Sequence, residues 1–527
     1  MMKNVDIMNI PKEKLEFVAR SEKIHDQKFD TKPIGYFKDA WIRFRKNKSS
    51  VAAFVIIMIL VLFAIVGPFL TPYTLSDRDG YYATARPKNS WFAGTGFWDG
   101  TYMRTDSWAG YYYYNSIGYE SGMQAVVGDY EVETTADGGK LYSFRTDSYY
   151  KVGYAYVTLT KDEYQAIKDY QNSNEGTQIL YPLPLSYNTK YSLGNSGANL
   201  WYKLKNATVG SDGAPDFDAD GDGIVSASEE GKYIPNYLTL DNAKSVKAVP
   251  DKNYDSSRID GDDDGSYVYA VKVQGGFKVR VNYYEYYTMK NGHEPSFLFG
   301  ANGHGQDIFC CLSNGARLSF ILAVVVSAIN LTIGSIYGAI EGYYGGTIDI
   351  VMERISDILA SVPFMVVATL FQMHLADQVG ILGSLLFAFV LTGWIGMAGR
   401  VRMQFYRFKG QEYVLAARTL GAKDGRIMFK HIFPNSLGTI ITGTVLVIPG
   451  VIFSESMLSF LGIVNLETSP NLMSIGTMLS QGSKFLETDP HVLIFPAVFI
   501  SLLEISFNLF GNGLRDAFNP SLRGVEE

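Results

Sequence analysis

Cysteine and histidine are scarce in this sequence of 527 residues. The only two cysteines, Cys310 and Cys311, are adjacent, and neighbouring cysteines rarely bridge because the bond would be strained. We therefore expect both to be packing residues. The six histidines form no metalloprotease motif. The sequence also contains no G-x-x-x-x-G-K-[ST] phosphate loop and no serine nucleophile elbow, which excludes an ATPase of the phosphate-loop class.

Charge and tyrosine are unevenly distributed along the chain. Residues 72–297 contain 30 Asp and Glu against 21 Lys and Arg, a net charge of −9, whereas the whole chain carries −7. The same residues hold 30 of the 36 tyrosines and no cysteine. We infer an acidic, tyrosine-rich domain inserted into an apolar, slightly basic one. Without cysteine, the inserted domain must fold on core packing or a metal rather than on disulfides.

Long apolar stretches outside the inserted domain predict membrane-spanning helices. A bilayer core of about 30 Å needs about 20 apolar residues of helix. The predicted spans are 51–69, 318–339, 350–375, 381–397, 439–460 and 492–510. Basic clusters before the first span and after the fourth predict that both regions are cytoplasmic. Six crossings then put both chain ends in the cytoplasm, and we expect Pro449-Gly450 to break the fifth helix.

The predicted fold is therefore a polytopic all-α membrane protein with an inserted extracytoplasmic α+β domain. Its parts are a cytoplasmic segment 1–50, a first span 51–71, the inserted domain 72–297, a helical core 298–515 with a cytoplasmic loop 400–436, and a cytoplasmic tail 516–527. Within the inserted domain, alternation predicts a strand at 151–160 and a helix at 161–171. A hairpin is predicted from strands at 267–273 and 277–287.

The basic stretch 406–435, between the fourth and fifth spans, has the pattern of two short helices. Glu412 to Leu420 is predicted to be a helix that ends at Gly421, and Pro434 is expected to end the second piece. One side of the first helix carries Leu415, Ala416 and Thr419. A cytoplasmic helix-glycine-helix between two spans is a place where a soluble partner could contact a membrane protein. An ordinary basic loop under the positive-inside bias explains the charge equally well.

The same stretch resembles the EAA loop of ABC-importer permeases, in Ala416-Ala417-x-x-x-Gly421 and in Pro434 thirteen residues later. The wider string EYVLAARTLGA…HIFPN is similar to the oligopeptide and dipeptide permeases, in their C-type subunit. The strings W-x-R-F-x-x-N-K near the start and FNLFGNGLRDAFNP near the end resemble the same family. Leu415 stands where the family has the acid that names the loop, and Glu412 is the nearest acid.

The resemblance implies the type I ABC-importer permease fold and a non-enzymatic transport role in the cytoplasmic membrane of a bacterium. It implies a second permease subunit, two ATP-binding subunits, and an extracellular substrate-binding protein that is soluble or lipid-anchored. The cargo would be an oligopeptide or dipeptide, and this chain would bind neither nucleotide nor nucleic acid. The residues implied to contact the ATPase are Glu412, Leu415, Ala416, Ala417, Gly421, His431 and Pro434.

Two alternatives remain open at the level of sequence. Related permeases carry nickel, although the spans contain no His or Cys cluster for a metal path, which favours peptide. A membrane-anchored extracellular binding or adhesion module belongs to another class, but six spans with a coupling loop exceed what an anchor requires. The inserted domain could dock the binding protein, gate peptide entry or contact the partner permease.

Residues 218–229, DADGDGIVSASE, fit the EF-hand calcium loop at every ligand position. The oxygen ligands would come from Asp218, Asp220, Asp222, the Ile224 carbonyl, Ser226 and Glu229. We expect a Ca²⁺ ion with a structural role there. A second acidic string, Asp260, Asp262 and Asp264, has only the first half of the pattern, because Val271 stands at position twelve. Calcium binding and a solvated turn fit this second string equally well.

Acidic residues inside predicted spans are costly in lipid and usually face the interior of a helix bundle. Glu455 in the fifth span and Glu504 in the sixth are candidates for lining a translocation path, and helix packing explains them equally well. In the third span, Arg354 and Asp357 are spaced to neutralise each other as an i, i+3 pair, next to Glu353.

Overall fold

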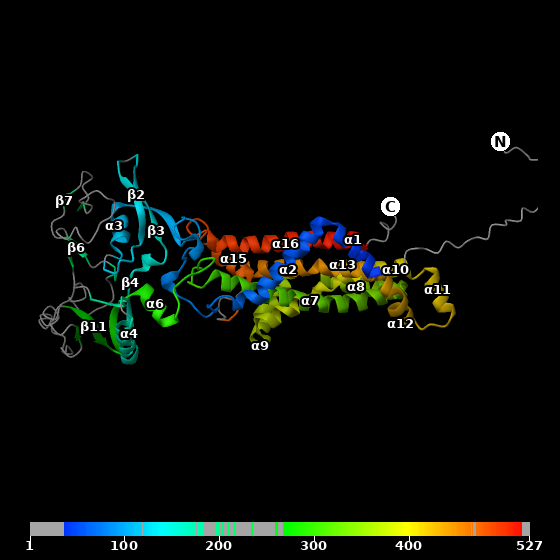
Figure 1. Cartoon of the computed structure of the whole chain (residues 1–527). Helices are drawn as coiled ribbons and strands as arrows, with labels where there is room; N and C mark the ends of the chain where they lie inside the picture. The colour runs from blue at the N-terminus through cyan, green and yellow to red at the C-terminus, as the bar shows by residue number, and fades with distance from the viewer. Residues whose placement is uncertain are drawn as a thin grey trace, which may run out of the picture.

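Strands and long helices occupy opposite ends of an elongated molecule (Figure 1). The computed structural model describes residues 36–518, apart from 119, 137, 175, 184–196, 200–201, 205–207, 210–214, 217–232, 236–258, 262–266, 465 and 467–470. The helix α11 (Glu412–Thr419) lies at the end of the helical part that is farthest from the strands.

The helical part contains helices of 9 to 37 residues, most of which are apolar. They are α1 (Tyr36–Lys46), α2 (Lys48–Val66), α7 (Ile308–Tyr344), α8 (Gly346–Ala360), α9 (Phe364–Gly393), α10 (Ile395–Phe408), α13 (Phe433–Val445), α14 (Val447–Phe460), α15 (Ile475–Ser483) and α16 (His491–Phe518). Among the described residues, five segments are long and apolar enough to cross a membrane: Lys48–Phe69, Ile308–Tyr344, Phe364–Phe408, Asp424–Phe460 and His491–Phe518. The chain is therefore a multi-pass membrane protein.

The third predicted span, 350–375, is wrong as a single helix. Helix α8 ends at Ala360, and α9 begins at Phe364 after a break that contains Pro363. Proline lacks the backbone N–H that would continue the helix, and its ring disfavours a helical conformation in the residue before it. The apolar pattern continues across the break, so hydropathy predicts one helix where the structure has two.

Helix α9 is a hairpin of two arms rather than one straight rod. Gly380 interrupts it with φ +79° and ψ 163°, a conformation that favours glycine. The rings of Phe364 and Phe389 lie 4.9 Å apart, and Gln372 Nε2 donates to the Ile381 carbonyl at 3.0 Å. These pairs, one at the ends of the arms and one near the turn, show that the arms run antiparallel. The turn agrees with the predicted gap between the third and fourth spans.

The predicted break in the fifth span lies a few residues earlier than expected. Helix α13 ends at Val445 and α14 begins at Val447, so Pro449 falls inside the first turn of α14. Proline at 449 has no N–H to donate to the carbonyl four residues before it, which belongs to Val445. The helix therefore breaks just after Val445, whose carbonyl has lost its hydrogen-bond donor, rather than at Pro449 itself.

Helix α7 packs closely against α10 through a stripe of glycines. A Cβ on Gly338 would lie 2.2 Å from the Ala398 carbonyl oxygen, and one on Gly342 would lie 2.6 Å from that of Arg402. Gly334, one turn earlier, meets α10 in the same way. Small residues at this spacing allow two helix backbones to approach in a membrane, where dispersion contacts replace the hydrophobic effect as the driving force.

The other end of the molecule contains two antiparallel sheets and short helices. The strands and helices there are β1 (Thr101–Asp106), α3 (Trp108–Ser116), β2 (Val126–Thr134), β3 (Lys140–Asp147), β4 (Tyr154–Leu159), α4 (Lys161–Ser173), β5 (Leu180–Tyr181), β10 (Ile259–Gly261), β11 (Val268–Val273), β12 (Gly276–Asn282) and α6 (Tyr283–Asn291). One sheet has the order β1-β3-β2, and the other has the order β10-β11-β12-β4 with β5 also paired to β12. Short strands pair separately: β6 (Tyr202–Leu204) with β9 (Tyr233–Pro235), and β7 (Thr208–Val209) with β8 (Pro215–Asp216).

The predicted strand, helix and hairpin of this part are confirmed, with two errors of length. The strand predicted from 151 begins at Tyr154, because Tyr150–Val152 forms a 3-10 turn. Strand β4 and helix α4 lie where alternation and periodicity predicted them, and β11 and β12 form the hairpin. The strand predicted to continue to 287 ends at Asn282, whose side chain accepts hydrogen bonds from the backbone of Tyr284 and Glu285. Asparagine at this N-cap position starts α6, and it overrides the strand preference of the tyrosines that follow.

Much of the tyrosine forms the core of this part. Tyr82 and Tyr149 are fully buried, and burial raises the pKa of both phenols. The Tyr149 hydroxyl donates to the Arg86 carbonyl at 2.8 Å and accepts from the Phe297 amide at 3.1 Å. A buried phenol with partners on both sides stabilises the core without leaving an unsatisfied polar atom.

Polar contacts join the strand-rich part to the ends of the helices. Arg86 forms an ion pair with Asp489 at 3.1 Å, just before α16. Asp307 caps the N-terminus of α7 and accepts a hydrogen bond from Thr71 at 3.1 Å, while burial raises the pKa of its carboxyl to about 6. The two cysteines that follow are buried and free, as expected for packing residues.

Candidate coupling site

Helix α11 is the short helix predicted at the start of the basic loop. It runs from Glu412 to Thr419, and Leu420 caps it. Gly421 then adopts φ +82°, with its amide donating to the Arg418 carbonyl at 3.0 Å. A left-handed residue after the last turn is the usual end of a helix, and glycine adopts it without steric cost.

The two faces of α11 differ in burial. Val414 and Ala417 are turned inward, at 0% and 9% exposed, and Val414 packs in a cluster with residues of α7 and α10. Leu415 and Leu420 are turned outward, at 47% and 87% exposed, and Ala416 is exposed beside them. Ala417, one of the residues that the resemblance implies to contact the ATPase, therefore faces the spans, because position 417 follows 414 by three residues and shares its face.

Polar contacts hold the loop to the end of α7. The Tyr343 hydroxyl donates to Asp424 Oδ1 at 2.6 Å, and Arg418 Nη2 donates to the same hydroxyl at 3.3 Å. Asp424 belongs to α12 (Asp424–Arg426) and Arg418 to α11, so one phenol bridges both pieces of the loop. A movement of α11 is thereby linked to the last turn of a helix that runs the length of the bundle.

The second piece of the loop continues into α13 without the predicted stop. A π-helical turn, Ile427–Ile432, leads directly into α13, and Pro434 lies in the first turn of that helix. The Phe433 amide reaches back five residues to the Met428 carbonyl. The wider turn accommodates a proline that a regular helix interior would not. His431, half-buried in this turn, accepts a hydrogen bond on its carbonyl from Asn435.

An ion cluster joins α8 to α10 beside the loop. Arg402 donates to Asp349 at 2.6 and 3.0 Å and to Glu353 at 2.8 and 3.1 Å, and Tyr406 donates to Asp349. The predicted pair of Arg354 and Asp357 is confirmed at 3.1 Å, on the exposed side of α8. The sequence contained the acids of this cluster but no signal for Arg402, which lies 49 residues beyond Glu353.

Glu455 and Glu504 are not brought together. Glu455 is buried, and its two carboxylate oxygens accept from Ser319 of α7 at 3.0 Å and from Ser459 at 2.9 Å. Glu504 is half-buried in α16, and one of its oxygens has no hydrogen-bond partner in the described part of the chain. Glu455 therefore joins α14 to α7, and a translocation role for either acid stays a prediction.

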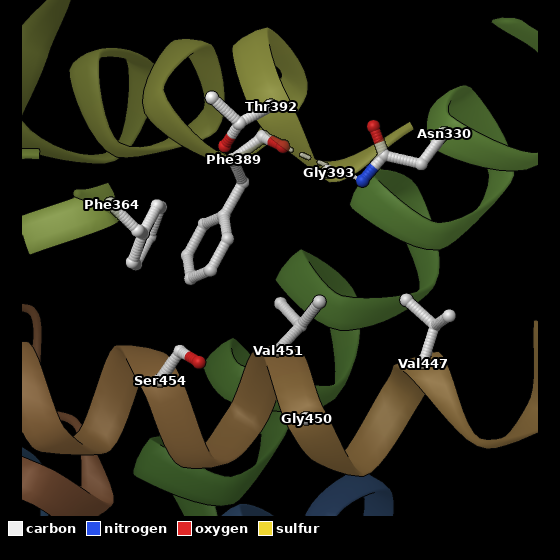
Figure 2. A pocket seen from close by; sticks show the side chains of 9 residues that line it. All are labelled: Asn330, Phe364, Phe389, Thr392, Gly393, Val447, Gly450, Val451 and Ser454. Atoms are coloured by element: carbon white, nitrogen blue, oxygen red, sulfur yellow. Dashed lines mark hydrogen bonds between the residues drawn. The ribbon is translucent and has the colours of Figure 1, made fainter. Parts of the chain in front are cut away.

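A pocket of about 280 Å³ opens between α7, α9 and α14 (Figure 2). Phe364 and Phe389 of the two α9 arms face Val451 of α14 across it. The polar groups at its edge are Asn330, Thr392 and Ser454. Neither Glu455 nor Glu504 lines this pocket, and most of its lining is apolar.

Two family models match the chain on either side of the strand-rich part. The model described as "Binding-protein-dependent transport system inner membrane component" matches residues 318–524, and "N-terminal TM domain of oligopeptide transport permease C" matches residues 35–87. The chain is 42% identical over 245 residues to the oligopeptide transport system permease protein OppC of Bacillus subtilis, which covers 46% of this chain and 78% of that protein. It belongs to this family of oligopeptide and dipeptide permeases, in the C-type subunit.

A second curated relative and one solved structure are also similar to parts of this permease. It is 42% identical over 226 residues to the dipeptide transport system permease protein DppC of Bacillus subtilis, covering 43% of this chain and 69% of that protein. An inward-facing structure of the MetNI methionine ABC transporter is similar over 40% of this chain and 96% of that one, at 16% identity and a TM-score of 0.34. Residues 88–317 lie outside both family models, so most of the strand-rich part is additional to the matched regions.

The predicted calcium loop of this permease, 218–229, lies outside the residues that the structure describes, as do Asp262 and Asp264. Asp260 lies in the short strand β10, which pairs with β11. In the described part of the chain, no group of three or more His, Cys, Asp or Glu side chains is placed to hold a metal. Both calcium predictions therefore stay predictions.

The Arg402 ion cluster and the exposed Arg354–Asp357 pair of α8 provide a matched test of this permease's stability. Replacing Arg402 with Gln removes the shared counter-charge of Glu341, Asp349 and Glu353, so we expect a loss of about 1–3 kcal/mol in the free energy of unfolding. The exposed pair is the control, and Arg354→Gln should cost less than about 1 kcal/mol. Thermal unfolding of the purified permease in one detergent measures both. Equal melting temperatures for the two variants would contradict the assignment.

Proposed function

We propose that this chain is the C-type permease subunit of an ABC importer that carries oligopeptides or dipeptides across the cytoplasmic membrane of a bacterium. The observation that carries the proposal is the two-faced helix α11. Its outer face presents Leu415 and Leu420 to solvent, while its inner face is packed on the spans. A partner that docks on the outer face would move a helix joined to the transmembrane bundle. The cargo is inferred from the relatives, which are named as oligopeptide and dipeptide permeases.

In this proposal the chain crosses the membrane six times. Helix α8 with the first arm of α9 forms the third crossing, and the second arm with α10 forms the fourth. Helices α1 and α11 lie at the same end of the bundle (Figure 1), as an even number of crossings between them requires. Basic residues in the last turn of α1 favour the cytoplasm for that end. The strand-rich part then lies outside the cell.

The proposed assembly contains a second permease beside this chain, two ATP-binding subunits at α11 and its counterpart, and an extracellular binding protein that delivers the peptide. Coupling is mechanical, because this permease carries no nucleotide-binding loop. Closure of the ATP-binding subunits would push α11, and Tyr343 would pass the displacement to α7. The spans would then rock between inward-open and outward-open arrangements.

Charged substitutions on the outer face of α11 should uncouple transport. We expect Leu415→Asp and Leu420→Asp to reduce co-purification of the ATP-binding subunits and peptide uptake at least tenfold, because each places a charge in an apolar contact. Glu412→Gln should have a smaller effect. Uptake of a labelled peptide and pull-down of the assembled transporter are the measurements.

The matched control is Leu486→Asp, since Leu486 is also exposed but lies between α15 and α16, near the opposite end of the bundle. This variant should assemble normally with the ATP-binding subunits. Full assembly and uptake in both α11 variants would overturn the proposal.

We also propose that residues 218–229 bind Ca²⁺ and that the ion stabilises the inserted part. The support is the complete EF-hand ligand pattern in a segment without cysteine. Addition of millimolar Ca²⁺ to the full chain should raise its melting temperature, while Mg²⁺ should have less effect, because a loop with a bidentate acid favours the larger ion. Glu229→Gln should remove the calcium response. The role is wrong if Ca²⁺ leaves the melting curve of the unaltered chain unchanged.

A further inference from the structure

The strand-rich part contains a pocket of about 450 Å³ that the proposed transport mechanism does not use. It lies between the ends of β1 and β3, an edge of β2, and a loop with the sequence Ala93-Gly94-Thr95-Gly96. Two cationic and two acidic side chains line it: Lys88, Arg145, Asp99 and Asp147. Pockets of this volume are large enough for a small organic ligand.

Lys88 presents an ammonium group whose position is fixed by aromatic rings. Its Nζ lies 4.7 Å from the ring centre of Tyr149, 5.5 Å from that of Tyr150 and 5.6 Å from that of Tyr284. Within the described part of the chain it forms no ion pair. Contacts with ring faces orient an ammonium but leave its N–H donors available.

Asp147 presents an acceptor at the same pocket. It is 7% exposed, and the amides of Tyr149 and Tyr150 donate to its Oδ1 at 2.7 and 3.1 Å. Among the described residues, none donates to Oδ2. Burial raises the pKa of this carboxyl, which the two backbone hydrogen bonds and the charge of Lys88 oppose. Lys88 is therefore the nearby counter-charge of Asp147, but in the described part of the chain no ion pair joins them.

The other two charged residues shape the pocket. Asp99 is fully engaged, with Gly96 N donating to Oδ2 at 2.7 Å and Thr101 donating twice to Oδ1. Arg145 donates through Nη1 to Thr101 Oγ1 at 2.9 Å, and a Cβ on Gly96 would lie 2.9 Å from that nitrogen. Asp99 thus holds the loop. Arg145 Nη1 also donates to the Gly96 carbonyl at 3.4 Å, and among the described residues its Nε and Nη2 have no acceptor.

We propose that this pocket binds a small zwitterion, a free amino acid or a short peptide, with its ammonium on Asp147 Oδ2 and its carboxylate between Lys88 and Arg145. The charges of the four lining residues cancel, so an anion or a cation alone would leave one of the available groups without its counter-charge. A zwitterion satisfies both. The inference concerns a second binding site and does not depend on which solute the spans carry.

Calorimetric titration of the full chain in lipid nanodiscs tests the site with alanine, dialanine and trialanine. We expect saturable binding of at least one of them, and the preferred length reports the distance between the two charged ends. N-acetylation or C-terminal amidation of that ligand should each weaken binding at least tenfold, because each removes one charge. The proposal is overturned if none of the three ligands binds, or if the blocked ligands bind as well as the parent.

Variants assign each end of the ligand to its partner. In Lys88→Met, C-terminal amidation of the ligand should no longer change the affinity, whereas N-acetylation should still weaken binding. In Asp147→Asn, N-acetylation should no longer change the affinity, whereas amidation should still weaken binding. This exchange separates a binding role from damage to folding, which would lower the affinity for every ligand alike. The control is Lys161→Met, at the exposed start of α4, which should bind like the unaltered chain. Equal losses for both blocked ligands in Lys88→Met would contradict the assigned orientation.

Discussion

The close packing of α7 on α10 is the constraint on which the rest of the structure depends. Three glycines of α7 at intervals of four residues let the two backbones touch. At the same interface, Arg402 of α10 forms hydrogen-bonded ion pairs with Asp349 and Glu353 of α8. Helix α7 has 37 residues, so at 1.5 Å per residue it extends about 55 Å. Asp307 caps one end beside the strand-rich part, and Tyr343 holds the loop of α11 at the other. One rigid helix therefore connects the two ends of the molecule.

Helix α11 could be predicted from the sequence because its signals are local. Apolar spacing from Glu412, a glycine after the last turn and a basic surrounding predicted both its bounds and its end. Its orientation was not readable, since Ala416 and Ala417 are chemically identical and only the contact with α7 and α10 turns one of them inward. The same limit applies to Arg402, whose partners are distant in sequence and become neighbours only when α8 folds against α10.

Errors in the predicted spans have one physical origin. Hydropathy measures the cost of burying a segment in lipid, and that cost is nearly the same for a straight helix and for a broken one. Pro363 and Pro449 change the backbone without changing the apolar pattern, so the break before α9 was missed and the break before α14 was displaced. In the strand-rich part, Asn282 likewise changes the backbone, because it caps α6 and ends the strand that the tyrosines after it were predicted to continue.

The strand-rich part adds chemistry that the matched family regions do not cover. In the described residues, 11 of its tyrosines are buried in the core. Its charged pocket was not predicted, because Lys88, Arg145 and Asp147 come from separate elements and no spacing in the sequence relates them. Both features lie at the end of the molecule opposite α11, so the proposed ligand site and the proposed coupling site are far apart in space (Figure 1).

The central claim is that α11 is the cytoplasmic contact through which an ATP-binding subunit moves the spans. A single cysteine introduced as Leu420→Cys tests it most directly, because both natural cysteines are buried. In the assembled transporter, we predict that this thiol cross-links to the ATP-binding subunit and that the yield changes when ATP is added. A thiol that reacts with an impermeant reagent from outside intact cells, or that never cross-links to the subunit, would contradict the account.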